Sequence, residues 1–127
     1  MEVNPYYWLN YSRLGGAYLR FGQNEDALRA YQKVAELAPD SDSGYSNIGV
    51  VYYREGKWNE ALAAFQKALA LRPSASVYSN LGTIYFYLSR YSESATMFEK
   101  AVARSKRSKL LPLRSRSASR KAPNASG

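Results

Sequence analysis

The segment 42–74, DSGYSNIGVVYYREGKWNEALAAFQKALALRPS, contains two amphipathic helical patterns separated by a glycine. In its first half, four residues recur at the spacing of one helical face: Tyr45, Ile48, Gly49 and Tyr52. Gly56 follows them, and glycine readily adopts the left-handed conformation that ends a helix. Pro73 closes the second half, because proline cannot continue the helical hydrogen-bond ladder. The segment therefore predicts a helical hairpin with helices over 42–55 and 57–71.

This hairpin pattern recurs along the chain with a fixed period. Pro5, Pro39 and Pro73 are each 34 residues apart. Between them, three features repeat in register: a Leu/Ile-Gly pair at 14–15, 48–49 and 81–82, a small residue at Ala27, Ala61 and Ser94, and an aromatic residue at Tyr31, Phe65 and Phe98. The third copy is one residue shorter than the others. A repeat of this length predicts a stack of similar helical hairpins rather than a single globular core.

The repeated glycine lies inside the first helix of each unit, where glycine costs about 0.8–1.0 kcal/mol relative to alanine. We expect glycine at this position because the second helix of the hairpin approaches too closely for a side chain. The small residues at 27, 61 and 94 are expected to face this crossing from the second helix. The aromatic residues at 31, 65 and 98 are then expected to fill a wider gap beside the crossing.

These residues resemble the tetratricopeptide repeat, whose pattern combines Leu-Gly, tyrosine, alanine, an aromatic residue and a closing proline. The second unit, 42–74, supplies this pattern in full. The first unit, 8–41, has Val34 where alanine is usual, and the third, 75–108, has Ser94 and lacks the closing proline. The resemblance implies an all-α fold, an α-solenoid of three antiparallel helix-turn-helix hairpins wound into a right-handed superhelix.

The flanking residues predict an array that is incomplete at both ends. Residues 1–7 include Asn4-Pro5 and resemble the end of a preceding repeat. Residues 109–127 form a basic tail rich in serine, arginine and lysine, which we expect to be disordered because Pro112 argues against a helix. No capping helix is expected after residue 104. We therefore expect a segment of a longer array or a shortened relative of one, with self-association through the uncovered last hairpin as one consequence.

Composition narrows the classes of function. The sequence has no cysteine and no histidine, which excludes thiol nucleophiles, disulfides and the commonest general base. No nucleophile–base pair, metal cluster or phosphate loop is evident, so we expect neither enzyme activity nor a cofactor. The N-terminus lacks the basic start and apolar run of a signal peptide. No run of about 18 apolar residues predicts a membrane span, so a cytoplasmic protein is expected.

The net charge of +8 comes from the C-terminal end of the chain. Residues 1–103 hold ten basic and ten acidic residues, whereas residues 104–127 hold eight basic residues and no acidic one. The short runs 106–109 and 114–117 resemble nuclear-localisation or RNA-contacting arms. Nuclear localisation and weak, salt-sensitive nucleic-acid binding are therefore alternatives to a simple solvated tail.

In tetratricopeptide domains the first helix of each unit lines a concave groove, and the resemblance places such a groove on this chain. The predicted partner-binding residues are Arg13, Arg20, Asn47, Tyr53, Arg54, Asn80, Thr83 and Tyr87. Leu19 and Val50 are placed on the same face. The asparagines can donate to and accept from a peptide backbone, and they resemble part of the asparagine ladder of O-linked N-acetylglucosamine transferases. The arginines, predicted near one end of the groove, favour a carboxylate, and the tyrosines offer apolar anchors. The alternative interpretation is an ordinary solvated face.

One mechanism of the family can be compared position by position. Chaperone-binding tetratricopeptide domains clamp a C-terminal carboxylate with lysine, arginine and asparagine side chains at set positions. Here the corresponding positions in the first and third units hold Ser12, Gly16, Ser76 and Asn80. Only Asn47, in the second unit, matches the clamp. A chaperone-tail clamp is therefore not expected.

Three functions remain open on the sequence. The leading hypothesis is a non-catalytic interaction scaffold that holds a protein or peptide ligand in the concave groove. The second is the repeat portion of a larger enzyme or signalling protein, such as a glycosyltransferase-like or kinase-associated arm. The third is an RNA-associated protein that binds through its basic tail.

Overall fold

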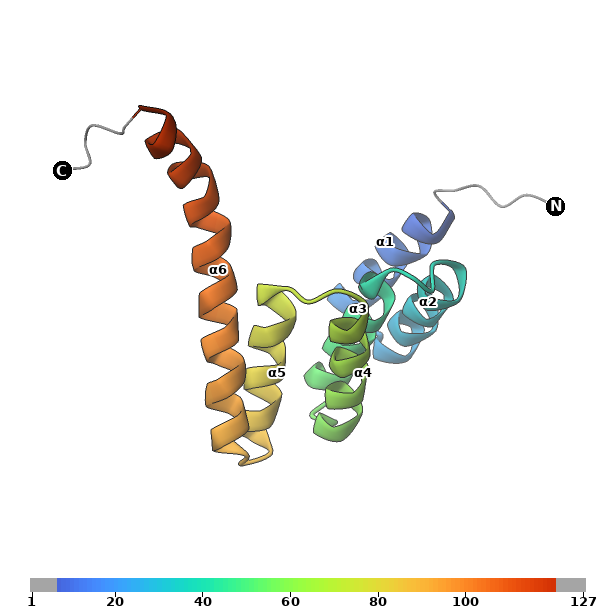
Figure 1. Ribbon diagram of the computed structural model, residues 1–127. Helices are drawn as coiled ribbons and strands as arrows, with labels where there is room; N and C mark the ends of the chain where they lie inside the picture. The colour runs from blue at the N-terminus through green and yellow to red at the C-terminus, as the bar shows by residue number, and fades with distance from the viewer. Residues whose placement is uncertain (1–6, 121–127) are drawn as a thin grey trace.

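Within residues 7–120, six α-helices follow one another and form three consecutive hairpins (Figure 1). The structure, a computed structural model, describes the backbone of residues 7–120 and the side chains of residues 7–106. The helices are α1 (Tyr7–Arg20), α2 (Asn24–Leu37), α3 (Asp42–Arg54), α4 (Trp58–Leu71), α5 (Ala75–Tyr87) and α6 (Tyr91–Arg120). No strand occurs between residues 7 and 120. The predicted all-α architecture is confirmed.

The hairpins pair helices that are adjacent in the sequence. Within the hairpins, α1 packs on α2, α3 on α4 and α5 on α6. The hairpins join through α2 against α3 and through α4 against α5. The stacking order therefore follows the sequence order, so each unit is stabilised by its chain neighbours.

Serine side chains cap the first helices of the second and third hairpins. The Ser41 hydroxyl accepts a hydrogen bond from the backbone N–H of Ser43 at 3.2 Å, and α3 begins at Asp42. In the same way, the Ser74 hydroxyl accepts from the N–H of Val77 at 3.2 Å where α5 begins. Each cap satisfies one of the backbone donors that a helix N-terminus leaves unpaired.

In each hairpin, one tight turn joins the two helices, and one residue of each turn has a left-handed backbone conformation. Gly22 has φ of 79° and Gly56 has φ of 72°, which glycine adopts without steric cost. The third turn places Ser89 in this region with φ of 62°. Around the second turn, α3 ends and α4 begins one residue inside the predicted ranges 42–55 and 57–71. The hairpin predicted from the sequence is therefore confirmed at its turn.

The repeated glycine lies directly against the repeated aromatic ring. A Cβ atom on Gly49 would lie 2.8 Å from Cζ of Phe65, and one on Gly82 would lie 2.9 Å from the ring of Phe98. At Gly15 the corresponding distance to the Tyr31 ring is 2.6 Å in the first hairpin. The prediction that these rings fill a gap beside the crossing was wrong. Because the glycine has no side chain, the aromatic ring of the second helix can occupy the space directly against the first helix.

The small residue of each second helix is enclosed at the same crossing. Ala27 and Ala61 are fully buried, and Ser94 is nearly so. The Ser94 hydroxyl donates a hydrogen bond of 2.7 Å to the backbone carbonyl of Gly82 in the facing helix. The departure from alanine in the third unit is therefore accommodated by a satisfied polar contact. This contact confirms that position 94 faces the first helix of its hairpin.

The buried side chains form two clusters, and each cluster crosses a boundary between hairpins. One contains Leu19, Ala27, Tyr31, Val34 and Val51, from the first and second hairpins. The other contains Ala61, Phe65, Ala68, Val77, Leu81, Ile84 and Tyr85, from the second and third. Val50 packs against both clusters. The core is therefore continuous along the stack, and no hairpin buries its apolar face alone.

The last helix is much longer than predicted. α6 continues through Pro112 to Arg120, a length of 30 residues, and its second half extends past the end of α5 (Figure 1). The expected disorder after residue 108 is therefore wrong for 109–120. The packed first half supplies the helix nucleus, so each further residue requires only propagation, and basic residues near the C-terminus favour the helix dipole. The predictions for residues 1–6 and 121–127 lie outside the described part of the chain.

Candidate functional site

The first helices of the three hairpins present two aligned rows of predicted site residues. Arg13, Asn47 and Asn80 occupy the same repeat position in α1, α3 and α5. Seven residues later, the same helices carry Arg20, Arg54 and Tyr87. Because seven residues complete almost two helical turns, each pair shares a helix face and lies about 10 Å apart along the axis. A chain segment that crosses the three helices would meet one row and then the other.

The polar members of these rows are accessible to a ligand. Arg13, Arg20 and Arg54 are exposed, and among residues 7–106 none of the three forms an ion pair. Asn47 and Asn80 are partly buried. The three arginines were predicted near one end of the groove. Only Arg20 and Arg54, in the last turns of α1 and α3, lie there, because Arg13 is two turns earlier in its helix.

Two predicted site residues belong to a larger set of aromatic side chains. The Tyr53 and Tyr87 rings, from α3 and α5, have centroids 6.1 Å apart. Trp58 lies against both of them, stacked on Tyr87 with a centroid distance of 4.4 Å and an interplanar angle of 3°, and 5.5 Å from Tyr53. Phe86 contacts Tyr87 at 6.0 Å and Tyr91 at 5.4 Å. We call these five residues the aromatic cluster.

The aromatic cluster is open to solvent. Phe86, Tyr87 and Tyr91 are each half or more exposed, and Tyr53 is about one-third exposed. Burial, followed by the charge and hydrogen bonding of Tyr87, raises the pKa of Tyr53 above its ordinary value. Contiguous exposed aromatic surface of this kind is typical of binding sites.

Sequence reasoning missed Trp58 and Tyr91 as site residues. Trp58 contacts the core, as a residue on the buried stripe of α4 would, but its ring also stacks on Tyr87. Both missed residues occupy the same repeat position, nine residues after the repeated glycine of their units. The first unit has Asn24 at this position. An aromatic residue at the same place in two successive units was the signal that could have identified them.

Three other predicted positions have more local roles. Thr83 is partly buried, and its hydroxyl donates to the backbone carbonyl of Ser79 at 3.1 Å, within α5. Leu19, predicted on the groove face, is 8% exposed and lies in the core, and Val50 packs against both core clusters. The placement of these two residues on a free binding face was wrong, because Leu19 packs in the core of the first two hairpins and Val50 packs against the cores of both hairpin boundaries.

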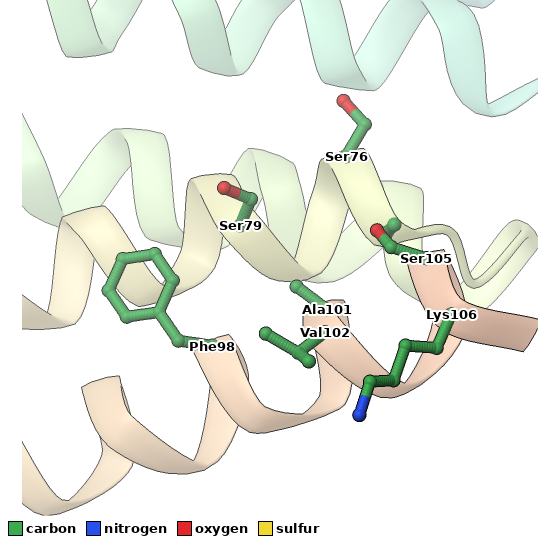
Figure 2. Close-up of a pocket in the computed structure, with 8 residues that line it drawn as sticks. Ser76, Ser79, Phe98, Ala101, Val102, Ser105 and Lys106 are labelled. Carbon is green, nitrogen blue, oxygen red and sulfur yellow. The ribbon is translucent and has the colours of Figure 1, made fainter. Parts of the chain in front are cut away.

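A separate open cavity lies between the last two helices (Figure 2). Its volume is about 570 Å³, and its apolar wall includes Phe98, Ala101 and Val102 of α6. Ser76 and Ser79 of α5 and Ser105 and Lys106 of α6 provide polar atoms. A neighbouring hollow of about 400 Å³ shares Phe98 and Val102 and continues along α6. Sequence reasoning predicted an uncovered last hairpin but did not identify these lining residues.

In the part of the chain that the structure describes, no three or more His, Cys, Asp or Glu residues gather as metal ligands. No helix in that part is both long and apolar enough to cross a membrane.

The repeat geometry is matched by a family profile described as tetratricopeptide repeat, over residues 8–74 and again over 40–107. The chain belongs to the tetratricopeptide repeat family. The two overlapping matches agree with the hairpin stack, in which the second unit has neighbours on both sides. A comparison of this tetratricopeptide protein with curated proteins gives no match.

Several solved structures resemble this tetratricopeptide stack. A crystal structure of MamA is 24% identical with a TM-score of 0.76, covering 80% of this chain and 60% of that chain. A structure of MamA MSR-1 is 28% identical with a TM-score of 0.71, covering 82% and 60%. The first TPR of Spaghetti (RPAP3), bound to the HSP90 peptide SRMEEVD, is 24% identical with a TM-score of 0.75, covering 81% and 82%. The chain spans about 60% of the length of these MamA chains.

Proposed function

We propose that this chain is a non-catalytic interaction scaffold that binds an extended peptide or partner segment across α1, α3 and α5. The observation that carries the proposal is the exposed aromatic cluster, which joins Tyr53 and Tyr87 of two successive first helices. Exposed aromatic side chains fixed by their neighbours lose little entropy on binding and often dominate binding energy. The related fold of Spaghetti with its bound peptide supports a peptide ligand.

The side chains beside the aromatic cluster favour a particular kind of segment. Asn47 and Asn80 can each donate to and accept from a peptide backbone, independently of the peptide's sequence. Arg20 and Arg54 carry guanidinium groups that bind carboxylates in bidentate fashion. An extended segment with an apolar or aromatic side chain and a nearby acidic group therefore fits this surface best.

The likeness to a domain with a bound HSP90 peptide does not extend to a chaperone clamp. The positions of the first and third units that would hold the clamp carry Ser12, Gly16, Ser76 and Asn80. These groups provide no cation for a terminal carboxylate. The prediction that the chain lacks this clamp therefore remains part of the proposal.

A peptide selection tests the proposed surface directly. A random-peptide library would be selected on residues 1–127, and the enriched peptides would be titrated by fluorescence anisotropy. The groove variant Asn47→Ala/Asn80→Ala/Arg54→Glu is expected to bind at least about tenfold more weakly, because it removes backbone contacts and reverses one charge. The matched control Gln32→Ala/Asn59→Ala/Arg72→Glu makes the same types of change at exposed positions outside the first helices and is expected to bind normally.

A variant of the aromatic cluster separates its role from that of the polar rows. Tyr87→Ala removes the ring that stacks on Trp58 and is expected to weaken the same peptides, with folding checked by circular dichroism. Equal affinity of the wild-type chain, the groove variant and Tyr87→Ala for every selected peptide would exclude this surface as the binding site.

A further inference from the structure

The last hairpin exposes an apolar face that the first two hairpins bury. The ring at the repeated aromatic position is 5% exposed for Tyr31 and 1% for Phe65, but 38% for Phe98. Four residues further along α6, Val102 is 56% exposed, whereas Ala35 and Leu69 at the same repeat position are partly buried. The cavity of about 570 Å³ between α5 and α6 lies at this face.

The stack itself shows what covers this face elsewhere. In the first hairpin it is covered by α3, where a Cβ atom on Gly44 would lie 2.9 Å from the backbone nitrogen of Ala35. In the second hairpin it is covered by α5, whose Val77 is buried in the cluster against which Leu69 packs. The natural occupant of the face is therefore the first helix of a following tetratricopeptide unit.

The outer surface of α1 has the matching residues exposed. Leu14 is 42% exposed, whereas Leu81 at the same repeat position is 1% exposed because α4 covers it. Ala17 is exposed, whereas Val51 and Ile84 at its repeat position are fully buried. α1 therefore presents to solvent the face that α3 and α5 use to cover the preceding hairpin.

Within the described residues, the continuation of α6 to Arg120 does not cover the open face. α6 runs as one helix to Arg120, and its second half extends beyond α5 rather than turning back (Figure 1). Three polar residues, Ser76, Ser105 and Lys106, lie at the edge of the open face. In α1, Asn10 stands at the repeat position of Gly44 and Val77, so it would bring a carboxamide toward these polar groups.

From these complementary faces we propose that the chain associates head to tail, with α1 of one copy docked on the α5–α6 face of another. The contact continues the interface already formed by α2 with α3 and by α4 with α5. It joins two different faces, so every complex retains one free α5–α6 face and one free α1 face, and growth is open-ended. The rows on α1, α3 and α5 and the aromatic cluster are not required for the contact.

Sedimentation velocity over a concentration series tests the proposal with the full chain. Wild-type protein is expected to shift to larger species as its concentration rises. Val102→Glu places a charge on the α6 face, and Leu14→Glu places one on the α1 face. Each is expected to weaken association at least about tenfold, because a buried unpaired carboxylate is strongly disfavoured. Both positions are exposed in the monomer, so folding should survive, as checked by circular dichroism.

Mixing the two variants identifies the geometry. Leu14→Glu retains an intact α5–α6 face and Val102→Glu retains an intact α1 face, so their mixture is expected to form a one-to-one dimer that grows no further. Leu71→Glu, at a similarly exposed apolar residue of α4, is the matched control and is expected to associate like the wild type. A wild-type chain that stays monomeric throughout, or a mixture that fails to form the dimer, would overturn the proposal. Association lost in Val102→Glu but retained in Leu14→Glu would also overturn it, because that result indicates a symmetric α6–α6 contact.

Discussion

At the scale of single residues, each hairpin is closed by a glycine against an aromatic ring. The three glycine–ring contacts share one geometry, but the rings differ in how tightly the surrounding residues enclose them. Phe65 is 1% exposed and lies in the cluster that the second and third hairpins form together, whereas Phe98 is 38% exposed. The effect of adding a methyl group at Gly49 or Gly82 therefore depends on the freedom of the ring opposite it.

Gly49→Ala is expected to lower the free energy of unfolding by about 1–2 kcal/mol. The new methyl group would lie 2.8 Å from the buried Phe65 ring, and this overpacking outweighs the higher helix propensity of alanine. Gly16→Ala is the control, because its methyl group would meet only the Tyr31 hydroxyl, at 3.6 Å. The control should be neutral or stabilising by up to about 1 kcal/mol. Urea unfolding followed by circular dichroism measures both, and equal stability of the two variants would contradict the prediction.

The sequence predicted which residues mark each hairpin crossing but not how they meet. The spacing of Gly49, Ala61 and Phe65 was sufficient to identify the crossing. It could not show that the ring rests on the glycine, because periodicity gives the face of a helix and not the rotamer of a side chain. The same limit explains why the stacking of Trp58 on Tyr87 could not be predicted. An aromatic ring can contact the core with one edge and a surface tyrosine with its face.

At the scale of helices, the ends are defined by local contacts. Ser41 and Ser74 cap α3 and α5, and an exposed ion pair joins Arg90 to Glu93 in the first turn of α6. The guanidinium of Arg90 also lies over the Tyr85 ring, 4.8 Å from its centroid. These contacts lie within a few residues in sequence. The boundaries of the second hairpin could be predicted closely because they too depend on local signals, the Gly56 turn and Pro73.

The ion pair at the start of α6 makes the acid titration of Glu93 a sensitive measurement. Hydrogen bonding to Arg90 lowers the pKa of Glu93, so the pair favours the folded state above the ordinary glutamate pKa and this contribution is lost as pH falls through the lowered value. Arg90→Ala is expected to move the Glu93 titration upward, as followed by carboxyl NMR. Lys100→Ala, an exposed change on the same helix, should leave it in place. An unchanged titration in Arg90→Ala would contradict the assigned pairing.

The length of α6 was the largest error at this scale. Pro112 was expected to stop the helix. In a helix already nucleated by packing, its missing N–H and the clash of its ring with the preceding turn reduce stability but do not end the helix. Local propensity rules cannot predict this nucleation, because it comes from the contacts of α5 with the first half of α6.

Pro112→Ala is expected to stabilise the second half of α6 without changing the stack. Restoring the missing backbone donor should slow amide hydrogen exchange between residues 106 and 120, since proline inside a helix costs about 3 kcal/mol relative to alanine. The midpoint of thermal unfolding should stay unchanged, because the packed units end earlier in the chain. Ser105→Ala, before the proline, serves as the control for a simple gain in helix propensity. Equal exchange rates in Pro112→Ala and the wild type would contradict the prediction.

At the scale of the whole molecule, stability is shared between neighbouring hairpins. Val50 contacts both core clusters, and Val51 of the second hairpin is buried in the cluster of the first. A change in the middle hairpin therefore affects two interfaces, whereas a change in the last hairpin affects one. The family and the stacked order followed from the sequence, because both depend on a repeated pattern. The aromatic cluster did not, because it forms between residues of different units whose rings meet only after stacking.

This sharing of contacts predicts unequal costs for the same substitution. Phe65→Leu is expected to lower the free energy of unfolding by about 1–2 kcal/mol, and Phe98→Leu by clearly less, because the Phe98 ring is partly exposed. Guanidinium-induced unfolding monitored by circular dichroism compares the two at matched, dilute protein concentration. Equal losses would show that the hairpins contribute independently of their position in the stack.

Ser89 gives the stack a preferred order of melting. Its left-handed backbone costs about 1–2 kcal/mol for a residue with a side chain, a strain that the glycines of the other two turns avoid. That strain lies in the hairpin whose apolar face is open in the described residues. On warming, the structure should therefore fray from its C-terminal hairpin toward the middle, and transient opening would release α5 before it disturbs α3.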